Sequence, residues 1–131
     1  MIRGVLTMGV MLTAGAAMAA DDPLAASRWK ARVVVIAAPS ADDPRLARQR
    51  KDLAAVQDGL RERAITVMEA VGDGAEARRL RVRLGLGESA FRVVLVGKDG
   101  TVKRSDDRPV SPDTLFATID AMPMRRDEMR R

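Results

Sequence analysis

The stretch FRVVLVGKDGTVKR, residues 91–104, decides the fold of this chain. Residues 93–96 form an unbroken apolar run, which is typical of a strand buried on both faces. Lys98, Asp99 and Gly100 then supply a tight turn into a second, half-exposed strand. Because a strand that is apolar on both sides needs cover on both sides, we expect helices above and below the sheet.

A second unbroken apolar run, residues 33–38, is the best candidate for the central strand. Asp43 and Pro44 follow it closely and are typical of a helix start, as N-cap and first helical residue. From there to about Arg63, leucines and a valine keep helical spacing: Leu46, Leu53, Val56 and Leu60. The pattern predicts one amphipathic helix, of about five turns, that packs on a sheet.

The next segment, residues 64–71, is a third strand candidate because it contains the β-branched Ile65, Thr66 and Val67. A strand, a helix and another strand make a βαβ unit, so the first two strands should be parallel. A second helix should follow, with Asp73 as its cap and Gly85 at its end.

Four arginines occupy the second predicted helix: Arg78, Arg79, Arg81 and Arg83. We interpret them as a solvated helix face whose charges also suit the helix C-terminus; an anion-binding patch is the alternative.

The last predicted helix begins at Ser111, Pro112 and Asp113, where a cap, a proline and an early acid occur in the expected places. Its apolar stripe is Leu115, Phe116, Ile119 and Met122. Pro123 should stop the helix, which leaves residues 124–131 as a charged tail.

The order β-α-β-α-β-β-α predicts an α/β, thioredoxin-like fold with three layers, α/β/α, and a mixed four-stranded sheet in the order 2-1-3-4. Trp29 should cover one end of the core. In that fold the chemistry lies after the central strand, which here means residues 39–44, and a cis-proline usually faces it near residues 89–91. Neither segment holds the redox residue, because residues 39–44 lack cysteine and residues 89–91 lack proline.

The composition excludes several functions. The 131 residues include no cysteine and no histidine, which removes thiol redox chemistry, disulfides, thiolate metal sites and the usual acid–base group at neutral pH. We therefore expect no metal and no cofactor. Ser40 has no nearby lysine to act as a base, and Asp42 and Asp43 lack the spaced oxygens of a calcium loop. The net charge of +5 is mild and aromatic residues are few, so nucleic acid is a poor match.

Residues 1–20 have the pattern of a signal peptide, with Arg3 before an apolar run and a small-x-small ending. Cleavage is expected after Ala19 or Ala20, with an uncleaved anchor as the alternative. The mature protein would then be periplasmic or secreted, with no stable membrane insertion. Residues 21–28 would be a lead-in, residues 29–126 the thioredoxin-like domain and residues 127–131 a charged tail.

Three motifs carry a family resemblance: WKAR at 29–32, VGKDG at 96–100 with Lys103, and IDAMPMRR at 119–126 with Glu128 and Met129. Together they resemble the P-DUDES domain, a DUF4174-type peroxiredoxin-like domain of unknown function in the thioredoxin-like superfamily. The resemblance covers about residues 24–131. It implies a thioredoxin-like fold and an extracytoplasmic location, as in the bacterial exported single-domain form, and it implies no established reaction.

The candidate ligand-binding residues are Lys98, Asp99, Gly100, Lys103, Arg125 and Arg126. If the last helix folds back beside the hairpin, their cations would suit a phosphate or a carboxylate. Structure alone would explain the first four as a turn with lysines that protect a strand edge, and the arginines as partners of Asp120 or Glu128.

The preferred hypothesis is thus a non-catalytic binding module for an acidic protein or a small anionic ligand. The alternatives are an oxidoreductase-related enzyme that uses a partner's thiol or a cofactor, and a purely structural component of the cell envelope.

Overall fold

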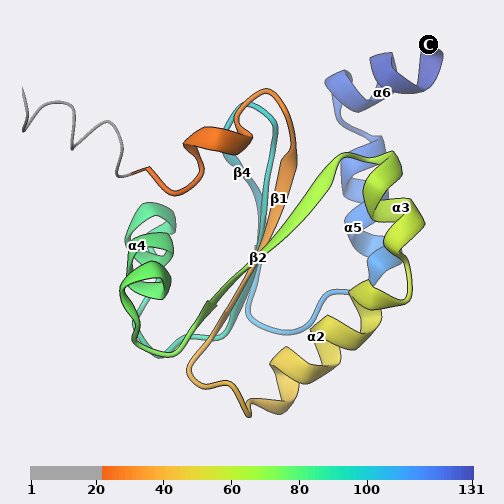
Figure 1. Cartoon of the computed structure of the whole chain (residues 1–131). Helices are drawn as coiled ribbons and strands as arrows, with labels where there is room; N and C mark the ends of the chain where they lie inside the picture. The colour runs from red at the N-terminus through yellow and green to blue at the C-terminus, as the bar shows by residue number, and fades with distance from the viewer. Residues whose placement is uncertain (1–21) are drawn as a thin grey trace, which may run out of the picture.

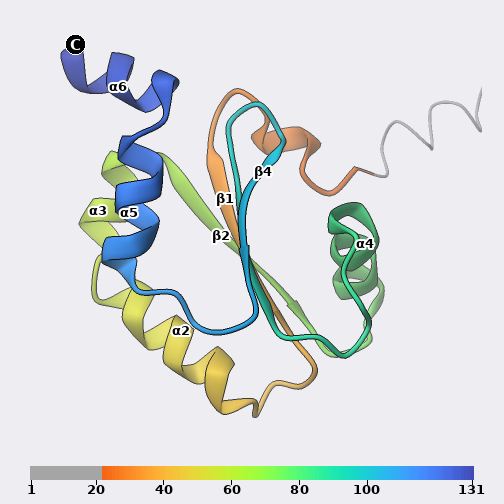
Figure 2. The same cartoon turned by 180° about the vertical axis from the view of Figure 1, so that it is seen from behind.

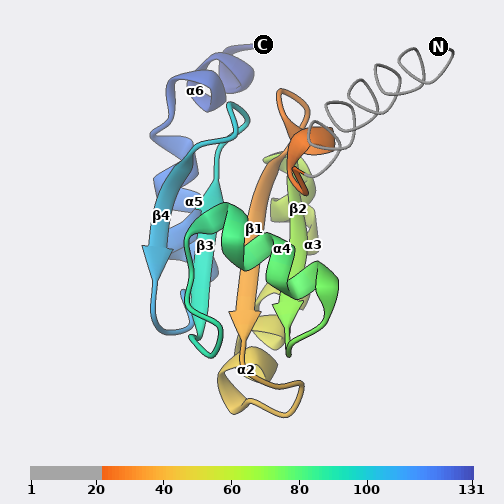
Figure 3. The same cartoon turned by 90° about the vertical axis from the view of Figure 1, so that its left-hand side faces the viewer.

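The computed structural model describes residues 22–131, so the predicted signal peptide and its cleavage site lie outside the described residues. Four strands form one sheet: β1 (Arg32–Ala38), β2 (Ile65–Val71), β3 (Arg92–Val96) and β4 (Val102–Asp106). Their order is β2-β1-β3-β4, with β1 parallel to β2 and antiparallel to β3 (Figure 3). The predicted mixed sheet is confirmed, and β1 is one of its two inner strands.

Helices cover both faces of this sheet. Helix α4 (Ala75–Leu84) lies on one face, while α2 (Pro44–Ala54), α3 (Gln57–Glu62) and α5 (Pro112–Asp120) lie on the other (Figures 1 and 2). A short 3-10 helix, η1 (Ala25–Ser27), precedes β1, and α6 (Pro123–Arg130) ends the chain. The three layers confirm the predicted thioredoxin-like architecture. Within residues 22–131, no helix is both long enough and apolar enough to cross a membrane.

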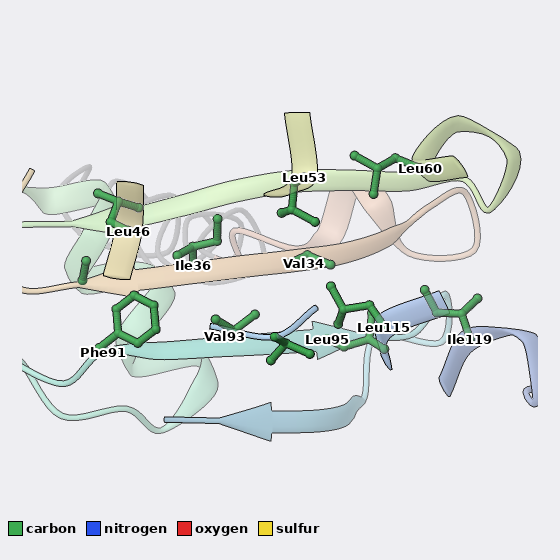
Figure 4. Close-up of a cluster of buried hydrophobic side chains, with 12 residues drawn as sticks. Val34, Ile36, Leu46, Leu53, Leu60, Phe91, Val93, Leu95, Leu115 and Ile119 are labelled. Atoms are coloured by element: carbon green, nitrogen blue, oxygen red, sulfur yellow. The ribbon is translucent and has the colours of Figure 1, made fainter. Parts of the chain in front are cut away.

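The sheet separates two hydrophobic cores. All seven residues of β1 are buried, and they alternate between the two faces. Val34 and Ile36 face α2, α3 and α5, and the larger core on this side includes Leu46, Leu53, Leu60, Leu115 and Ile119 of these helices together with Leu95 of β3 (Figure 4). Val33 and Val35 face α4 and pack in a smaller core with Leu80. The continuous apolar run therefore serves two cores at once, as the sequence predicts.

Local signals set three helix boundaries as predicted. Asp43 caps α2 by accepting a hydrogen bond from the Arg45 backbone N–H at 2.8 Å, and Ser111 caps α5 in the same way through Thr114. Gly85 ends α4 in the left-handed region, with φ of 68°. The prediction for Asp73 is wrong, because Gly74 holds the N-cap position of α4 and makes no side-chain cap.

The helix predicted to continue to Arg63 is two helices. The chain turns at Ala55 and Val56, where Val56 has φ of −127° and ψ of 38°. The turn redirects α3 so that Gly59 lies against Phe116 of α5; a Cβ at Gly59 would lie 2.7 Å from that ring. The apolar spacing is the same before and after the turn, so the pattern gives no sign of it.

The charged tail predicted at residues 124–131 is helical. Pro123 follows the end of α5 and occupies the first turn of α6, where a proline loses no helical hydrogen bond. Arg125 is the one buried residue of α6. Helix α6 is therefore attached by ion pairs more than by apolar contact, which an apolar pattern cannot predict.

Trp29 does not cover the core. Its side chain is 63% exposed, and its backbone lies in the left-handed region with φ of 67°. Its N–H donates to the Lys98 carbonyl at 2.6 Å, so its backbone ties the start of β1 to the β3–β4 turn. Leu24, just before η1, packs against the smaller core.

Candidate functional site

The three family motifs meet at one end of the sheet. Because β3 runs antiparallel to β1, the β3–β4 turn lies beside Arg32, the first residue of β1. The connection between α5 and α6 lies at the same end, whereas α2 starts from the opposite end of β1 (Figure 1). Segments that are far apart in sequence thus form one surface.

A groove of about 470 Å³ lies between these segments. One wall is the hairpin, with Gly97, Lys98, Asp99 and Lys103. The other wall comes from the end of α5 and its connection to α6 and is apolar except for Thr118; it consists of Thr118, Ala121, Met122, Pro123 and Met124. Arg32 completes the lining. An apolar wall that faces a charged one suits a ligand with both characters.

Glu128 joins the hairpin, β1 and α6. Arg32 donates to both of its carboxylate oxygens, at 3.3 and 3.2 Å, and the Lys98 ammonium donates at 2.8 Å. Burial by itself would raise the pKa of Glu128, but the hydrogen bonds and charges of Arg32 and Lys98 outweigh it and lower the pKa below its ordinary value. Lys98 is therefore already neutralised, and its side chain is only 14% exposed.

Arg125 turns away from the groove. Its side chain is 6% exposed and contacts Asp120 at 3.1 Å and Glu62 at 3.3 Å. Arg63 also donates to both carboxylate oxygens of Asp120, at 3.0 Å each. The hydrogen bond from Arg63, and with it that from Arg125, lowers the pKa of Asp120 against the opposing effect of burial. Arg125 is thus a structural link between α6, α5 and α3.

Asp99 organises the hairpin turn. It accepts hydrogen bonds from the backbone N–H and the hydroxyl of Thr101, at 3.0 and 2.8 Å, and from Lys103 at 3.0 Å. The Thr101 backbone contact, followed by the Thr101 hydroxyl and Lys103, lowers the pKa of Asp99 to about 2. Gly100 has φ of 83°, which a residue with a side chain rarely adopts.

Of the predicted ligand residues, the structure brings Lys98, Asp99 and Lys103 together in the groove, while Gly100 shapes the turn. The last helix does fold back beside the hairpin, but Lys98, Lys103 and Arg125 each have an acidic partner. Arg126 is exposed, outside the groove lining, and its side chain has no partner within residues 22–131. Ligand binding by these six residues stays a prediction.

Of the ten residues that line the groove, sequence reasoning named only Lys98, Asp99 and Lys103 as site residues. Arg32 and Thr118 are the two polar side chains that it missed. Arg32 is 1% exposed, and its Nη1 also donates to the Arg63 carbonyl at 2.8 Å. The sequence signal that could have identified Arg32 is its position directly before an apolar run, within the WKAR motif. Thr118 lies on the helix face that the apolar stripe leaves out, so nothing in the pattern distinguishes it.

The opposite end of β1 carries the segment where a thioredoxin-like fold usually places its chemistry. Ser40 donates to Asp42 at 2.5 Å, and Asp43 accepts from the Arg45 side chain at 3.0 and 2.7 Å. Arg45 lies 4.7 Å from the centre of the Phe91 ring. The polar groups of this segment are thus engaged in local capping. The segment lies about 20 Å from the groove, because the two are separated by the length of β1. Residues 22–131 contain no cluster of three acidic side chains that would hold a metal.

The arginines of α4 do not form one surface. Arg78 is exposed, but Arg81 is 2% exposed and is not part of a solvated face. Its guanidinium donates to the carbonyls of Ala38 at 2.6 Å, Ala70 at 3.1 Å and Gly87 at 2.9 Å. Arg81 therefore fixes the ends of β1 and β2 to the loop before β3, because carbonyls that leave a sheet need donors.

Two solved peroxiredoxin structures share this fold. The reduced 2-Cys peroxiredoxin of Plasmodium vivax is 15% identical, with a TM-score of 0.57 over 79% of this chain and 84% of that chain. The thioredoxin peroxidase I of Plasmodium yoelii is 15% identical, with a TM-score of 0.60 over 79% of each chain. Fold and sheet order thus define a thioredoxin-like, peroxiredoxin-like domain, here without cysteine.

The chain belongs to the family described as a domain of unknown function, DUF4174, whose sequence profile matches residues 23–128. The resemblance inferred from the three motifs is therefore confirmed at the level of the family. The sushi repeat-containing protein SRPX of rat and that of human are both 33% identical over 114 residues. This match covers 76% of the chain but 25% of each relative, so the chain spans about a quarter of their length.

Proposed function

We propose that this domain is a binding module and that the groove between the hairpin and the α5–α6 connection holds a ligand with an apolar body and an anionic end. One observation carries the proposal: the three family motifs, far apart in sequence, surround a single groove at the end of the sheet opposite the usual redox segment. If the expected signal peptide directs export, the domain would bind this ligand outside the cytoplasm.

The apolar wall suits the body of such a ligand. Met122 and Met124 have flexible, polarisable side chains that adapt to different shapes, and Pro123 fixes the backbone between them. Met124 is 41% exposed, so it is available to a ligand. The groove volume of about 470 Å³ is within the range of small-molecule sites, roughly 300–1,000 Å³.

Lys103 is the cation that best suits the anionic end. Its side chain is 34% exposed and its partner Asp99 is 36% exposed, so their pair is a surface ion pair. Such pairs contribute at most about 1 kcal/mol, which a carboxylate or phosphate can replace at little cost. Arg125 does not offer this exchange because it is buried among Asp120 and Glu62.

A binding role also agrees with the absence of cysteine and histidine from the whole chain, because the domain itself supplies no thiol for redox exchange. An oxidoreductase-related enzyme would take its thiol or cofactor from a partner. A structural envelope component would need no ligand in the groove. Neither alternative accounts for an apolar wall opposite an accessible lysine.

The probe for the test is 8-anilinonaphthalene-1-sulfonate, which has an apolar body, an anionic group and a fluorescence signal. We expect saturable binding that weakens with salt and that decanoate displaces. Ala121→Trp, which fills the groove, should abolish the displaceable signal. Lys103→Glu should weaken binding about fivefold, the equivalent of about 1 kcal/mol.

Lys51→Glu is the matched control, because Lys51 is an exposed lysine on α2 outside the groove lining. Its affinity should match that of the unmodified protein, and circular dichroism should show all variants folded. Equal affinity in Lys103→Glu and Lys51→Glu, or full binding in folded Ala121→Trp, would remove the groove as the site. A following pull-down from the envelope fraction, with Lys103→Glu as the bait variant, would then address an acidic protein partner.

A further inference from the structure

The two edges of the sheet differ in how they are protected. Edge strand β4 carries Lys103, Arg104 and Asp106, and its pairing with β3 contains a register irregularity between Leu95 and Val96. Charges and irregularities of this kind prevent an edge from pairing with another strand. Edge strand β2, with the sequence ITVMEAV, has no proline, lysine or arginine, and pairs with β1 in regular register over seven residues.

The backbone of β2 leaves one row of groups unpaired. Ala64 accepts from Arg32 at one end of the strand, and Gly72 donates to Ala38 at the other. Because strand backbone groups alternate in direction, the even-numbered residues between them face β1 and the odd-numbered residues face the open edge. These odd residues are Ile65, Val67, Glu69 and Val71, and within residues 22–131 the sheet places no strand beside them.

An apolar groove accompanies this open edge. Val67, which is 37% exposed, borders a groove of about 180 Å³ together with Leu53, Ala54 and Leu60, where α2 turns into α3. The side chains of the odd residues of β2 lie on this face of the sheet, as Ile65 and Val71 pack against the larger core. A strand added at the edge would cover the groove with its own side chains.

We infer that a second copy of this chain pairs antiparallel with β2 about a twofold axis at Met68. In this register Ile65 lies opposite Val71 of the second copy and Val67 lies opposite Glu69, so every outward residue of one strand meets an outward residue of the other. Each of these pairs exchanges two backbone hydrogen bonds. In this register all seven residues of β2 are paired with a residue of the second copy, whereas any other register leaves some of them unpaired.

Charge also permits this pairing. Glu69 is the one charged residue of β2, and Arg50 neutralises it through two hydrogen bonds at 2.7 and 2.5 Å. In the register centred on Met68, the two Glu69 side chains lie opposite Val67 and not opposite each other. The pairing therefore brings no like charges directly opposite each other, although each chain carries a net charge of +5. This interface lies away from the proposed ligand groove and does not depend on it.

A single introduced cysteine tests the register, because the chain has no other cysteine. The two Met68 residues would form the pair without hydrogen bonds at the axis, with Cα atoms about 4.5 Å apart, within disulfide range. Met68→Cys should therefore give a covalent dimer under mild oxidation. Thr66→Cys is the control, since its two copies would lie about 13 Å apart along the strands. Equal crosslinking of the two variants, or none in folded Met68→Cys, overturns the proposal.

Sedimentation equilibrium supplies the second test, which requires no oxidation. The unmodified protein should be a dimer, and Val67→Lys should raise its dissociation constant at least tenfold. Val102→Lys makes the same change at an exposed valine of the other edge strand and should leave dimerisation unchanged. A monomer at all concentrations to about 100 μM, well above the micromolar range of a specific pair, overturns the proposal.

Discussion

Glu128 of α6 accepts hydrogen bonds from both terminal nitrogens of Arg32, a residue 96 positions earlier at the start of β1. Arg32 is buried and Glu128 is partly exposed, with side-chain exposures of 1% and 23%. Lys98 of the hairpin contacts the same carboxylate. One acidic residue thus joins the three segments that carry the family motifs.

Removal of the charge of Glu128 should destabilise the domain. Glu128→Gln leaves the buried guanidinium of Arg32 without its counter-charge, and breaking a buried pair costs several kcal/mol. Because Glu128 is partly exposed, we expect a loss of about 2 kcal/mol in the free energy of unfolding. Urea denaturation measures it. Glu76→Gln, which breaks an exposed pair with Arg79, should change the value by less than about 0.5 kcal/mol.

Acid should destabilise the protein through the same region. The folded-state pKa values of Asp99, Asp120 and Glu128 are lowered, so their stabilising effect is complete above their ordinary values near 4 and is lost as pH falls toward the folded values, about 2 for Asp99. The free energy of unfolding should therefore decrease from about pH 4.5 to pH 2.

The pH dependence of the urea midpoint measures this loss. The amide of Asp99→Asn cannot take up a proton in this range, so the urea midpoint of this variant should depend less on pH. An identical slope in the two proteins would contradict the assignment to Asp99.

Replacement of Arg81 should be among the most damaging changes at a charged position. Arg81→Met keeps the apolar part of the side chain but leaves the carbonyls of Ala38, Ala70 and Gly87 without this donor. We expect a loss of about 3 kcal/mol or more, because several hydrogen bonds from one charged, buried group are lost together. Thermal denaturation checks this. Arg78→Met, on the exposed side of the same helix, should have an effect of less than about 0.5 kcal/mol.

The same substitution should have opposite effects at two alanines. Ala64 connects α3 to β2 with φ of 51°, a conformation that glycine adopts more easily, so Ala64→Gly should stabilise the protein by about 0.5 to 1 kcal/mol. Ala47 lies exposed within α2, so Ala47→Gly should destabilise it by about the same amount. Chemical denaturation of both variants measures the difference, and a loss of stability in Ala64→Gly would contradict the prediction.

Much of the fold follows from signals that act over a few residues. The two continuous apolar runs predict buried strands, and the succession of strands and helices predicts the thioredoxin-like fold and with it the sheet order. Asp43, Ser111 and Gly85 act at their own helix ends through contacts within four residues. Such contacts depend on the local sequence alone, which is why the prediction is correct there.

The candidate site is only partly of this kind. The hairpin turn at Lys98, Asp99 and Gly100 is local and was predicted, but the pairing of Lys98 with Glu128 spans 30 positions. The sequence does not show whether a lysine or arginine will be paired with a distant acidic residue in the folded protein. The predicted basic cluster therefore turned out to contain the neutralised Lys98, the buried Arg125 and the exposed Arg126.

By itself, the sequence determined the alternation of strands and helices and the absence of thiol and imidazole chemistry, since these depend on residue type and short-range spacing. The order of the sheet followed from the thioredoxin-like fold that this alternation predicts. The tertiary structure alone decided the turn at Val56, the helical end of the chain, the exposure of Trp29 and the choice of ion-pair partners. Each of these depends on which distant surfaces meet, and burial of a charge is favourable only after its partner has been brought beside it.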